Sequence, residues 1–286
     1  MLVYFAHVLA IAIPKAMPWL MVAASGGHGE GGHGDDHGGP SHLPSLVYYL
    51  EHYLHTGWLE HWVNIIYAFV TAIILIIIAQ VVYHKREMMP GPFQNAVEMV
   101  VEGLYNFFHS ILGKDAKQYT PFLGTLFVYI LINNWMGMIP LGHSPSTSLN
   151  ITLSLALLVF FYAQWTGIRR NGLGGYLHHL AGSPRDAIGW SMVILMFPLH
   201  IIGELAKPMS LALRLFGNIT GEDTLIAVFV GMGIAITPFI ADFVGIPLQT
   251  PFYFLGLLLS SVQALVFALL ATIYILLMLP HEEHEH

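Results

Sequence analysis

One segment decides what this chain can fold into. Residues 62–83, WVNIIYAFVTAIILIIIAQVVY, run for 22 positions without a formal charge. A helix needs about 20 such residues to cross the hydrocarbon core of a bilayer. The whole chain has the same character, since 56% of its 286 residues are hydrophobic and only 9% are charged. The sequence therefore predicts an all-α, polytopic membrane protein surrounded by a lipid bilayer.

Composition divides the chain into four parts. Residues 1–24 are apolar but lack the initial positive charge of a signal peptide, so we expect a retained segment that is not a full span. Residues 25–61 begin with a stretch rich in Gly and His. That stretch cannot bury enough surface to fold, and a solvated linker is favoured over a loose metal site. Residues 62–280 form the helical membrane domain, and residues 281–286, HEEHEH, form a tail.

Three shorter segments follow the first span. Residues 92–112 carry acidic residues on one face and apolar residues on the other, which favours a helix at the interface or packed on the bundle. The two sets are Glu98 and Glu102 against Val97, Val101, Leu104 and Phe108. Residues 119–140 and 148–168 are separated by the turn residues LGHSPST, which predicts a helical hairpin. The glycine-rich GIRRNGLGG after them is expected to be a loop, with a short helix at 176–180.

The last two segments are unusually long. As helices, residues 187–236 and 248–279 extend about 75 Å and about 48 Å, against a hydrocarbon core of roughly 30 Å. They therefore have to tilt strongly, lie along the membrane or break. Pro208 and the glycines at 203, 217, 221, 231 and 233 are candidate bend points. Together the segments predict about five membrane crossings and one amphipathic helix.

The basic residues predict the orientation of the chain, because cytoplasmic loops are enriched in Lys and Arg. Residues 25–61 contain none, so we expect this segment on the non-cytoplasmic side. Two basic groups are expected in the cytoplasm: Lys85, Arg86, Lys114 and Lys117 in one, and Arg169, Arg170 and Arg185 in the other. Five crossings then bring the C-terminus to the cytoplasmic side.

Arg214 lies inside an apolar segment, where insertion costs roughly 2.5–3.5 kcal/mol and a charge usually faces protein or water. A guanidinium cannot give up its proton, but it can hold a nearby carboxylate ionised. Its face is shared by Asn218, Lys207 and His200, at 100° per residue. No acid of the segment sits directly beside it, so we expect a partner from another helix or another chain. The competing interpretation is a snorkelling charge or a helix-pairing salt bridge.

Three acids flank Arg214 along the same segment. Glu204 and Glu222 mark the ends of one stripe about 27 Å long, and Asp223 lies on the side opposite Arg214. This pattern suits two aqueous approaches divided by a positive barrier. Ordinary solvation of a helix end explains Glu222 and Asp223 equally well. Lys207 is expected to snorkel or to face water.

The final segment carries a polar stripe. Gln249, Gly256, Ser260 and Gln263 are spaced by seven, four and three residues, which places them on one helix face. Gln263 could hydrogen-bond Arg214 without neutralising it, since an amide carries no charge. Polar residues that hold two helices together give the same pattern.

Two longer motifs carry a family resemblance. KPMSLALRLFGNITGEDTL at 207–225 and SSVQALVFALLATIYILL at 260–277 resemble subunit a of the F-type ATP synthase. LINNWMGMIP, PSTSLNITLSLAL and the GIRRNG loop agree, so the resemblance covers most of residues 90–279. It implies a stator subunit in a bacterial inner membrane that packs its two long tilted helices against a ring of c subunits. It also implies two proton half-channels, with the b-subunit stalk and the remaining subunits as partners.

The same resemblance implies roles for single residues. Arg214 is the arginine that meets the c-ring carboxylate and prevents ions from passing directly between the half-channels. Gln263 is the glutamine packed near it, and Asn218 is the asparagine of LRLFGN. Asp223 stands where relatives often carry Glu or His, and Glu222 beside it could share that role.

Departures from the family pattern limit what can be carried over. Gly256 and Ser148 stand where some relatives have histidine and aspartate, so no polar role is transferred to either position. His200 stands where some relatives have glutamate. A cytoplasmic half-channel through His200 and Glu204 is therefore a hypothesis of its own, suited by the titration of histidine near neutral pH.

Other function classes fit less well. A secondary transporter also buries charges between broken helices, but it predicts internal repeats, and the two halves show no convincing similarity. HExxH and GxxxxGK[ST] are absent, which disfavours a zinc protease and an ATP site. The chain has no cysteine, so thiolate chemistry is excluded. We expect no cofactor, no metal and no nucleic-acid partner.

Overall fold

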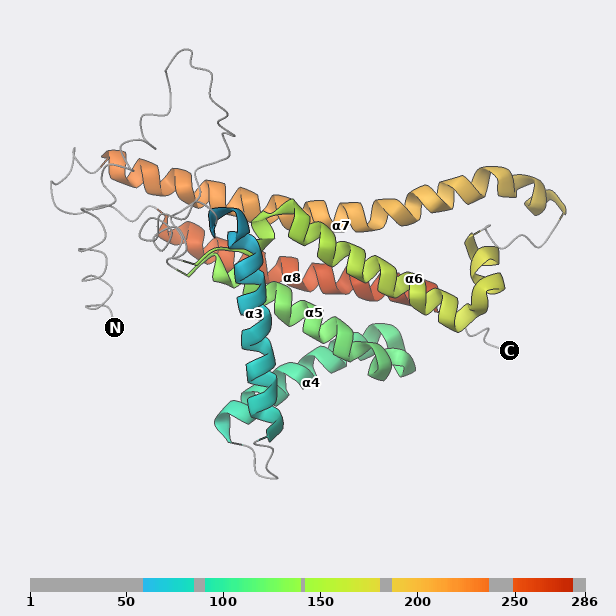
Figure 1. The fold of residues 1–286 in the computed structure, drawn as a ribbon, viewed down its shortest axis with the longest axis horizontal. Coiled ribbons are helices and arrows are strands. Elements are labelled where there is room, and N and C mark those ends of the chain that lie inside the picture. The colour runs from blue at the N-terminus through green and yellow to red at the C-terminus, as the bar shows by residue number, and fades with distance from the viewer. Residues whose placement is uncertain (1–58, 85–90, 140–141, 181–186, 237–248, 280–286) are drawn as a thin grey trace, which may run out of the picture. The chain divides into compact units, whose positions relative to one another are not determined.

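The computed structural model describes residues 59–84, 91–139, 142–180, 187–236 and 249–279, and the regular structure in these ranges is entirely helical (Figure 1). The elements are α3 (Leu59–His84), α4 (Pro92–Leu112), η1 (Gly113–Asp115), α5 (Ala116–Met136), η2 (Pro145–Thr147), α6 (Leu149–Leu180), α7 (Ala187–Ile236) and α8 (Thr250–Met278). The predicted segment 1–24, residues 25–58 and the tail at 281–286 lie outside the described residues.

Three of the described helices are long and apolar enough to cross a membrane: Trp62–His84, Leu149–Tyr176 and Thr250–Met278. The chain is therefore an integral membrane protein built from helices. The first predicted span is confirmed and begins three residues earlier than expected, at Leu59.

Internal packing divides the chain into two compact units. The larger holds residues 45–220 and 257–286, and the smaller holds residues 1–44 and 221–256. In the smaller unit, Phe229 of α7 stacks on Phe252 of α8 with ring centroids 3.9 Å apart. All further contacts below, except where stated, lie within the larger unit.

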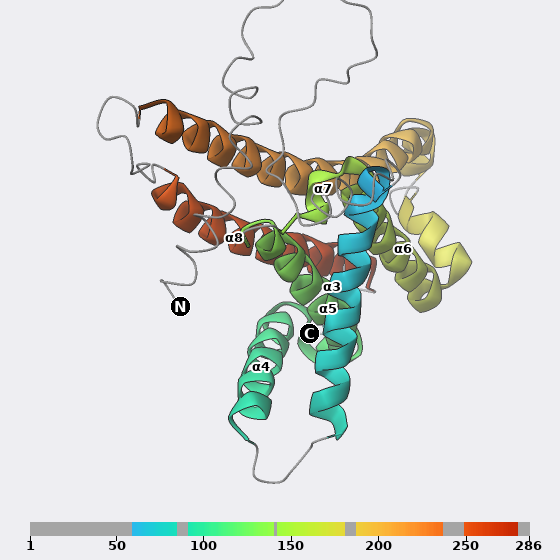
Figure 2. The ribbon, with the colours of Figure 1, turned by 60° about the vertical axis from the view of Figure 1, so that its left-hand side comes forward.

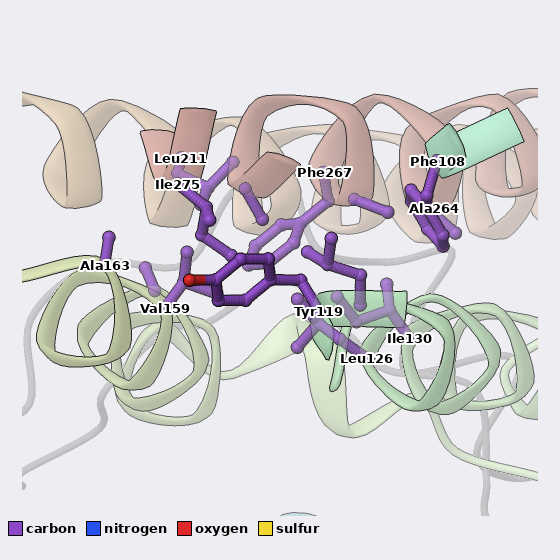
Figure 3. Packing of buried hydrophobic residues seen from close by; sticks show 14 of the residues in the cluster. Phe108, Tyr119, Leu126, Ile130, Val159, Ala163, Leu211, Ala264, Phe267 and Ile275 are labelled. Atoms are coloured by element: carbon purple, nitrogen blue, oxygen red, sulfur yellow. The ribbon is translucent and has the colours of Figure 1, made fainter. Parts of the chain in front are cut away.

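The core of the larger unit lies between α5, α6, α7 and α8 (Figure 3). Tyr119 of α5, Val159 of α6 and Phe267 of α8 are among its fully buried side chains, and the labelled side chains in Figure 3 point toward one another. Lipid tails are as apolar as these side chains, so close packing supplies the stability in place of exclusion from water. The predicted hairpin is confirmed, because Phe122 of α5 stacks on Tyr162 of α6 at 3.9 Å between centroids.

Helix α4 packs along α5, while α3 contacts both α5 and η2 (Figure 2). The predicted apolar face of α4 is confirmed only in part. Phe108 is fully buried and Leu104 packs against the core, but Val101 is 56% exposed. The contact face is therefore the Leu104, Phe108 and Leu112 stripe, since Leu112 is also buried and follows Phe108 at i+4.

Hydrogen bonds connect α3 to the α5–α6 hairpin. Nε2 of His143 lies 2.6 Å from Oδ1 of Asn64, and the hydroxyl of Tyr129 donates to the carbonyl of Ala68 at 3.3 Å. Thr71 is fully buried and donates to the carbonyl of Tyr67. The long apolar side of α3 stays exposed, as expected for a helix that meets lipid.

Helix α6 reverses its direction near its C-terminal end. Gly172 has φ 70° and ψ 164°, a conformation open almost only to glycine, and the helix resumes after it (Figure 1). The predicted loop over GIRRNGLGG is therefore wrong in extent, because residues 168–171 continue the helix and the break is confined to Gly172. The predicted short helix at 176–180 is present.

The two long helices are confirmed as single elements. Helix α7 runs for 50 residues through Pro198 and Pro208, and α8 runs for 29. Of the outcomes that the sequence allowed, a break of this helix does not occur, and α7 continues through Pro208, which the sequence names as a candidate bend point. Pro208 is buried, and packing around it holds the helix despite the backbone N–H that proline lacks.

Candidate ion-translocation site

Arg214 lies on α7 and is exposed. Among the residues that the structure describes, it has no hydrogen bond and no ion pair, which agrees with the prediction that its partner comes from outside this segment. Tyr274 of α8 lies within its electrostatic reach. Arg214 also borders an exposed apolar face of α7, made of Leu199, Ile202, Leu205, Met209 and Leu213.

Asn218 and Gln263 connect α7 to α8 close to Arg214. The Nδ2 of Asn218 donates to Oε1 of Gln263 at 2.6 Å. Among the described residues no hydrogen bond joins Gln263 to Arg214, so a contact between these two side chains stays a prediction. Gln263 is only 3% exposed, and its Nε2 finds no acceptor within the described ranges.

The predicted polar face of α8 is confirmed by burial. Gly256, Ser260 and Gln263 are all buried, and Gln249 is half-buried. The carbonyl of Ser260 accepts a hydrogen bond from Nδ2 of Asn134 on α5 at 3.3 Å. This face of α8 therefore packs against α5 as well as hydrogen-bonding α7 through Gln263.

Two adjacent asparagines of α5 continue this polar region, and the sequence singled out neither as a site residue. Asn134 accepts at Oδ1 from the hydroxyl of Ser146 at 2.9 Å. Asn133 is 1% exposed, and neither atom of its amide has a hydrogen-bond partner in the part of the chain that is described. A buried amide in that state is usually satisfied by ordered water. The available signal was the pair of amides in an otherwise apolar helix.

Glu204 is held by two side chains. Lys207 donates to its Oε1 from one turn further along α7, and Gln164 of α6 donates to Oε2 at 3.0 Å. The expectation that Lys207 snorkels or faces water is therefore wrong. Its ammonium pairs with Glu204 and lies 5.6 Å from the ring centroid of Tyr274, within the range of a cation–π interaction.

A narrow cavity adjoins this ion pair. Its lining includes Gln164, Glu204, Lys207 and Tyr274. The space open to the centre of a water molecule is about 10 Å³, which is about the requirement of one water.

The structure does not join His200 to Glu204 by a hydrogen bond. His200 is exposed, and its Nδ1 lies 3.0 Å from the carbonyl of Met196 on its own helix. Glu222 and Asp223 belong to the smaller unit, where both are half-buried. Tyr253 lies within electrostatic reach of Asp223.

Among the described residues, no group of three His, Cys, Asp or Glu side chains could hold a metal ion. Glu204 pairs with Lys207, while the neighbours Glu222 and Asp223 interact with each other.

Comparison with known proteins identifies the family. The family model for the ATP synthase A chain matches residues 65–276. ATP synthase subunit a of Protochlamydia amoebophila is 49% identical over 85% of this chain and 91% of its own length. Subunit a of Solidesulfovibrio magneticus is 38% identical over 74% and 82%, and that of Chlorobium phaeobacteroides is 32% identical over 92% and 81%. These matches disfavour the secondary transporter that the sequence left open, and they place the chain in the ATP synthase A chain family.

Proposed function

We propose that this chain is the ion-translocating stator subunit of an F-type ATP synthase, with Arg214 as the barrier between two proton half-channels. One observation carries this proposal: Arg214 is exposed and unpaired within the described residues, while the neighbouring cation Lys207 is neutralised by Glu204. A charge left open inside an apolar surface needs a partner of opposite sign from another chain.

The apolar face beside Arg214 supports a rotating ring of c subunits as that other chain. Its five exposed side chains repeat at intervals of three or four residues along α7, so they form one stripe. A carboxylate on the ring that arrives at Arg214 becomes ionised, because a nearby cation favours the charged form. The ring then carries no proton past Arg214, so a proton taken up from one half-channel reaches the other only when the ring turns the long way round.

Glu204 and its partners form the inner end of the cytoplasmic half-channel in this proposal. The assignment follows from charge, since Arg169 and Arg170 lie on the same helix as Gln164, little more than one turn further along, and basic residues mark the cytoplasmic side. The non-cytoplasmic half-channel passes Asn133 and the polar face of α8 toward Asn218 and Gln263. Glu222 and Asp223 are further candidates for ion translocation, on the strength of the family resemblance alone.

The larger assembly follows from the family. The chain works with the other ATP synthase subunits and supplies no catalytic site for ATP. The b-subunit stalk binds it as a stator, five helices cross the bacterial inner membrane, and the N-terminus is non-cytoplasmic. His200 is the entry to the cytoplasmic half-channel in this proposal, because it is exposed on α7 one turn before Glu204.

The test is ATP-driven acidification of inverted membrane vesicles that contain the assembled complex. We expect Arg214→Ala to lower pumping at least tenfold at matched assembly and to add a passive proton leak. Arg169→Ala removes another exposed arginine outside the proposed site and serves as the control. Unchanged pumping in Arg214→Ala, with the complex assembled, would make Arg214 a structural charge and end this proposal.

A further inference from the structure

We infer that Gln164 and Tyr176 are positioning residues for Glu204, and that the reversal of α6 at Gly172 exists to form this Tyr176–Gln164–Glu204 chain. The inference rests on the proposed function, because it takes Glu204 to be part of the cytoplasmic half-channel. It adds two residues of α6 for which the family motifs in the sequence give no role.

The hydrogen bonds run in one direction. The hydroxyl of Tyr176 donates to Oε1 of Gln164 at 2.6 Å, and Nε2 of Gln164 donates to Oε2 of Glu204 at 3.0 Å. An amide rotated by half a turn would present its oxygen to the carboxylate, and two acceptors repel. The Tyr176 hydroxyl holds the amide in the donating orientation, so it acts on Glu204 through Gln164.

Glu204 has few other partners. Its side chain is 17% exposed, and the adjoining cavity has room for about one water. The charged or titratable groups around it are Lys207 of α7, Tyr176 of α6 and Tyr274 of α8. Because bulk water is largely excluded, these groups and Gln164 hold the Glu204 carboxylate in place.

The backbone of α6 brings Tyr176 and Gln164 close enough to form these hydrogen bonds. Gly172 reverses the helix, which brings Tyr176 back to a residue twelve positions earlier. A Cβ at Gly167 would lie 3.3 Å from Cδ2 of Tyr176 and 3.1 Å from the sulfur of Met278, so a side chain there would push the tyrosine aside. Asn171, one turn after Gly167, ties this end of α6 to the end of α8, since its Nδ2 donates to the carbonyl of Met278 at 2.9 Å.

The test compares Gln164→Leu and Tyr176→Phe with the native chain in the assembled complex, by ATP-driven acidification of inverted vesicles across a range of pH. We expect pumping to fall about tenfold in Gln164→Leu and about threefold in Tyr176→Phe. We also expect the pH profile of pumping to move in Gln164→Leu, because Gln164 donates the hydrogen bond to Oε2 of Glu204. Thr166→Val removes a buried hydroxyl two residues from Gln164 and is the control.

The same substitutions in a Glu204→Gln background separate positioning from packing. If Gln164 acts only through Glu204, then Gln164→Leu causes little further loss there. An equal loss in both backgrounds, or a pH profile that does not move, would overturn the inference and leave the barrier role of Arg214 untouched. If Glu204→Gln abolishes pumping, the pH profiles of the single variants decide whether Gln164 acts through Glu204. If Glu204→Gln has no effect on pumping, the inference is wrong, while Arg214→Ala separately tests the proposed function.

Discussion

Asn218 and Gln263 join α7 to α8 beside Arg214 through one hydrogen bond between amides. We expect Asn218→Leu and Gln263→Leu each to lower pumping about fivefold, because a neutral hydrogen bond contributes about 1 kcal/mol. The double variant should be little worse than either single variant, since both remove the same contact. The measurement is ATP-driven acidification of inverted vesicles at matched assembly.

Asn150→Leu is the control for this pair, because Asn150 is exposed at the start of α6 and its side chain takes no part in the site. Additive losses in the double variant would show that the two amides act separately. In that case Gln263 would work through its unpaired Nε2, which can donate to water, and the 2.6 Å contact would be incidental.

The sequence predicts single residues best where a charge stands in an apolar segment. Arg214 and Glu204 stand out for that reason, and helical spacing places Asn218 on the Arg214 face. Spacing cannot say which neighbouring helix supplies a partner. The hydrogen bond between Asn218 and Gln263 and the ion pair between Lys207 and Glu204 therefore do not follow from the spacing. Gln164 gave no signal, since its role depends on a reversal of the chain.

The turn of α6 gives a prediction for one whole element. Gly172→Ala should lower the free energy of unfolding by about 1–3 kcal/mol, because φ 70° with ψ 164° is strained for any residue with a Cβ. It should also lower pumping, since Tyr176 follows the turn. Gly174→Ala is the matched control: its added Cβ meets no atom within 4 Å, and alanine favours the helix.

Unfolding of the purified chain in mixed micelles, driven by SDS and followed by circular dichroism, measures both variants. Equal stability in Gly172→Ala and Gly174→Ala would mean that the chain relaxes around position 172, and the turn would then not be fixed by glycine. A loss of stability without a loss of pumping would contradict the link between the turn and Glu204.

Elements were predictable from the sequence in proportion to their apolar length. The segment at 62–83 and both long segments appear as α3, α7 and α8 with ends displaced by only a few residues. The loop after residue 167 was misjudged, because glycine lowers helix propensity on average while only Gly172 departs from helical geometry. Helix α7 continues through the candidate bend point Pro208, although proline lacks the N–H of a helical hydrogen bond.

The orientation of the whole chain rests on the positive residues at both ends of the α5–α6 hairpin. We expect Lys114 and Gly174 to face the cytoplasm and Asn150, at the opposite end of the hairpin, to face the other side. All three positions are exposed, and the chain has no natural cysteine. Single cysteines placed there report their side through a maleimide that cannot cross the membrane.

In inverted vesicles Lys114→Cys and Gly174→Cys should react with this maleimide, and Asn150→Cys should react only in right-side-out vesicles. A membrane-permeant maleimide should label all three, which controls for local access. Reaction of Asn150→Cys and Gly174→Cys from one side would mean that α6 does not cross the membrane, and five crossings would be wrong. A complete exchange of sides would keep the crossings but reverse the chain, and Glu204 would then belong to the non-cytoplasmic half-channel.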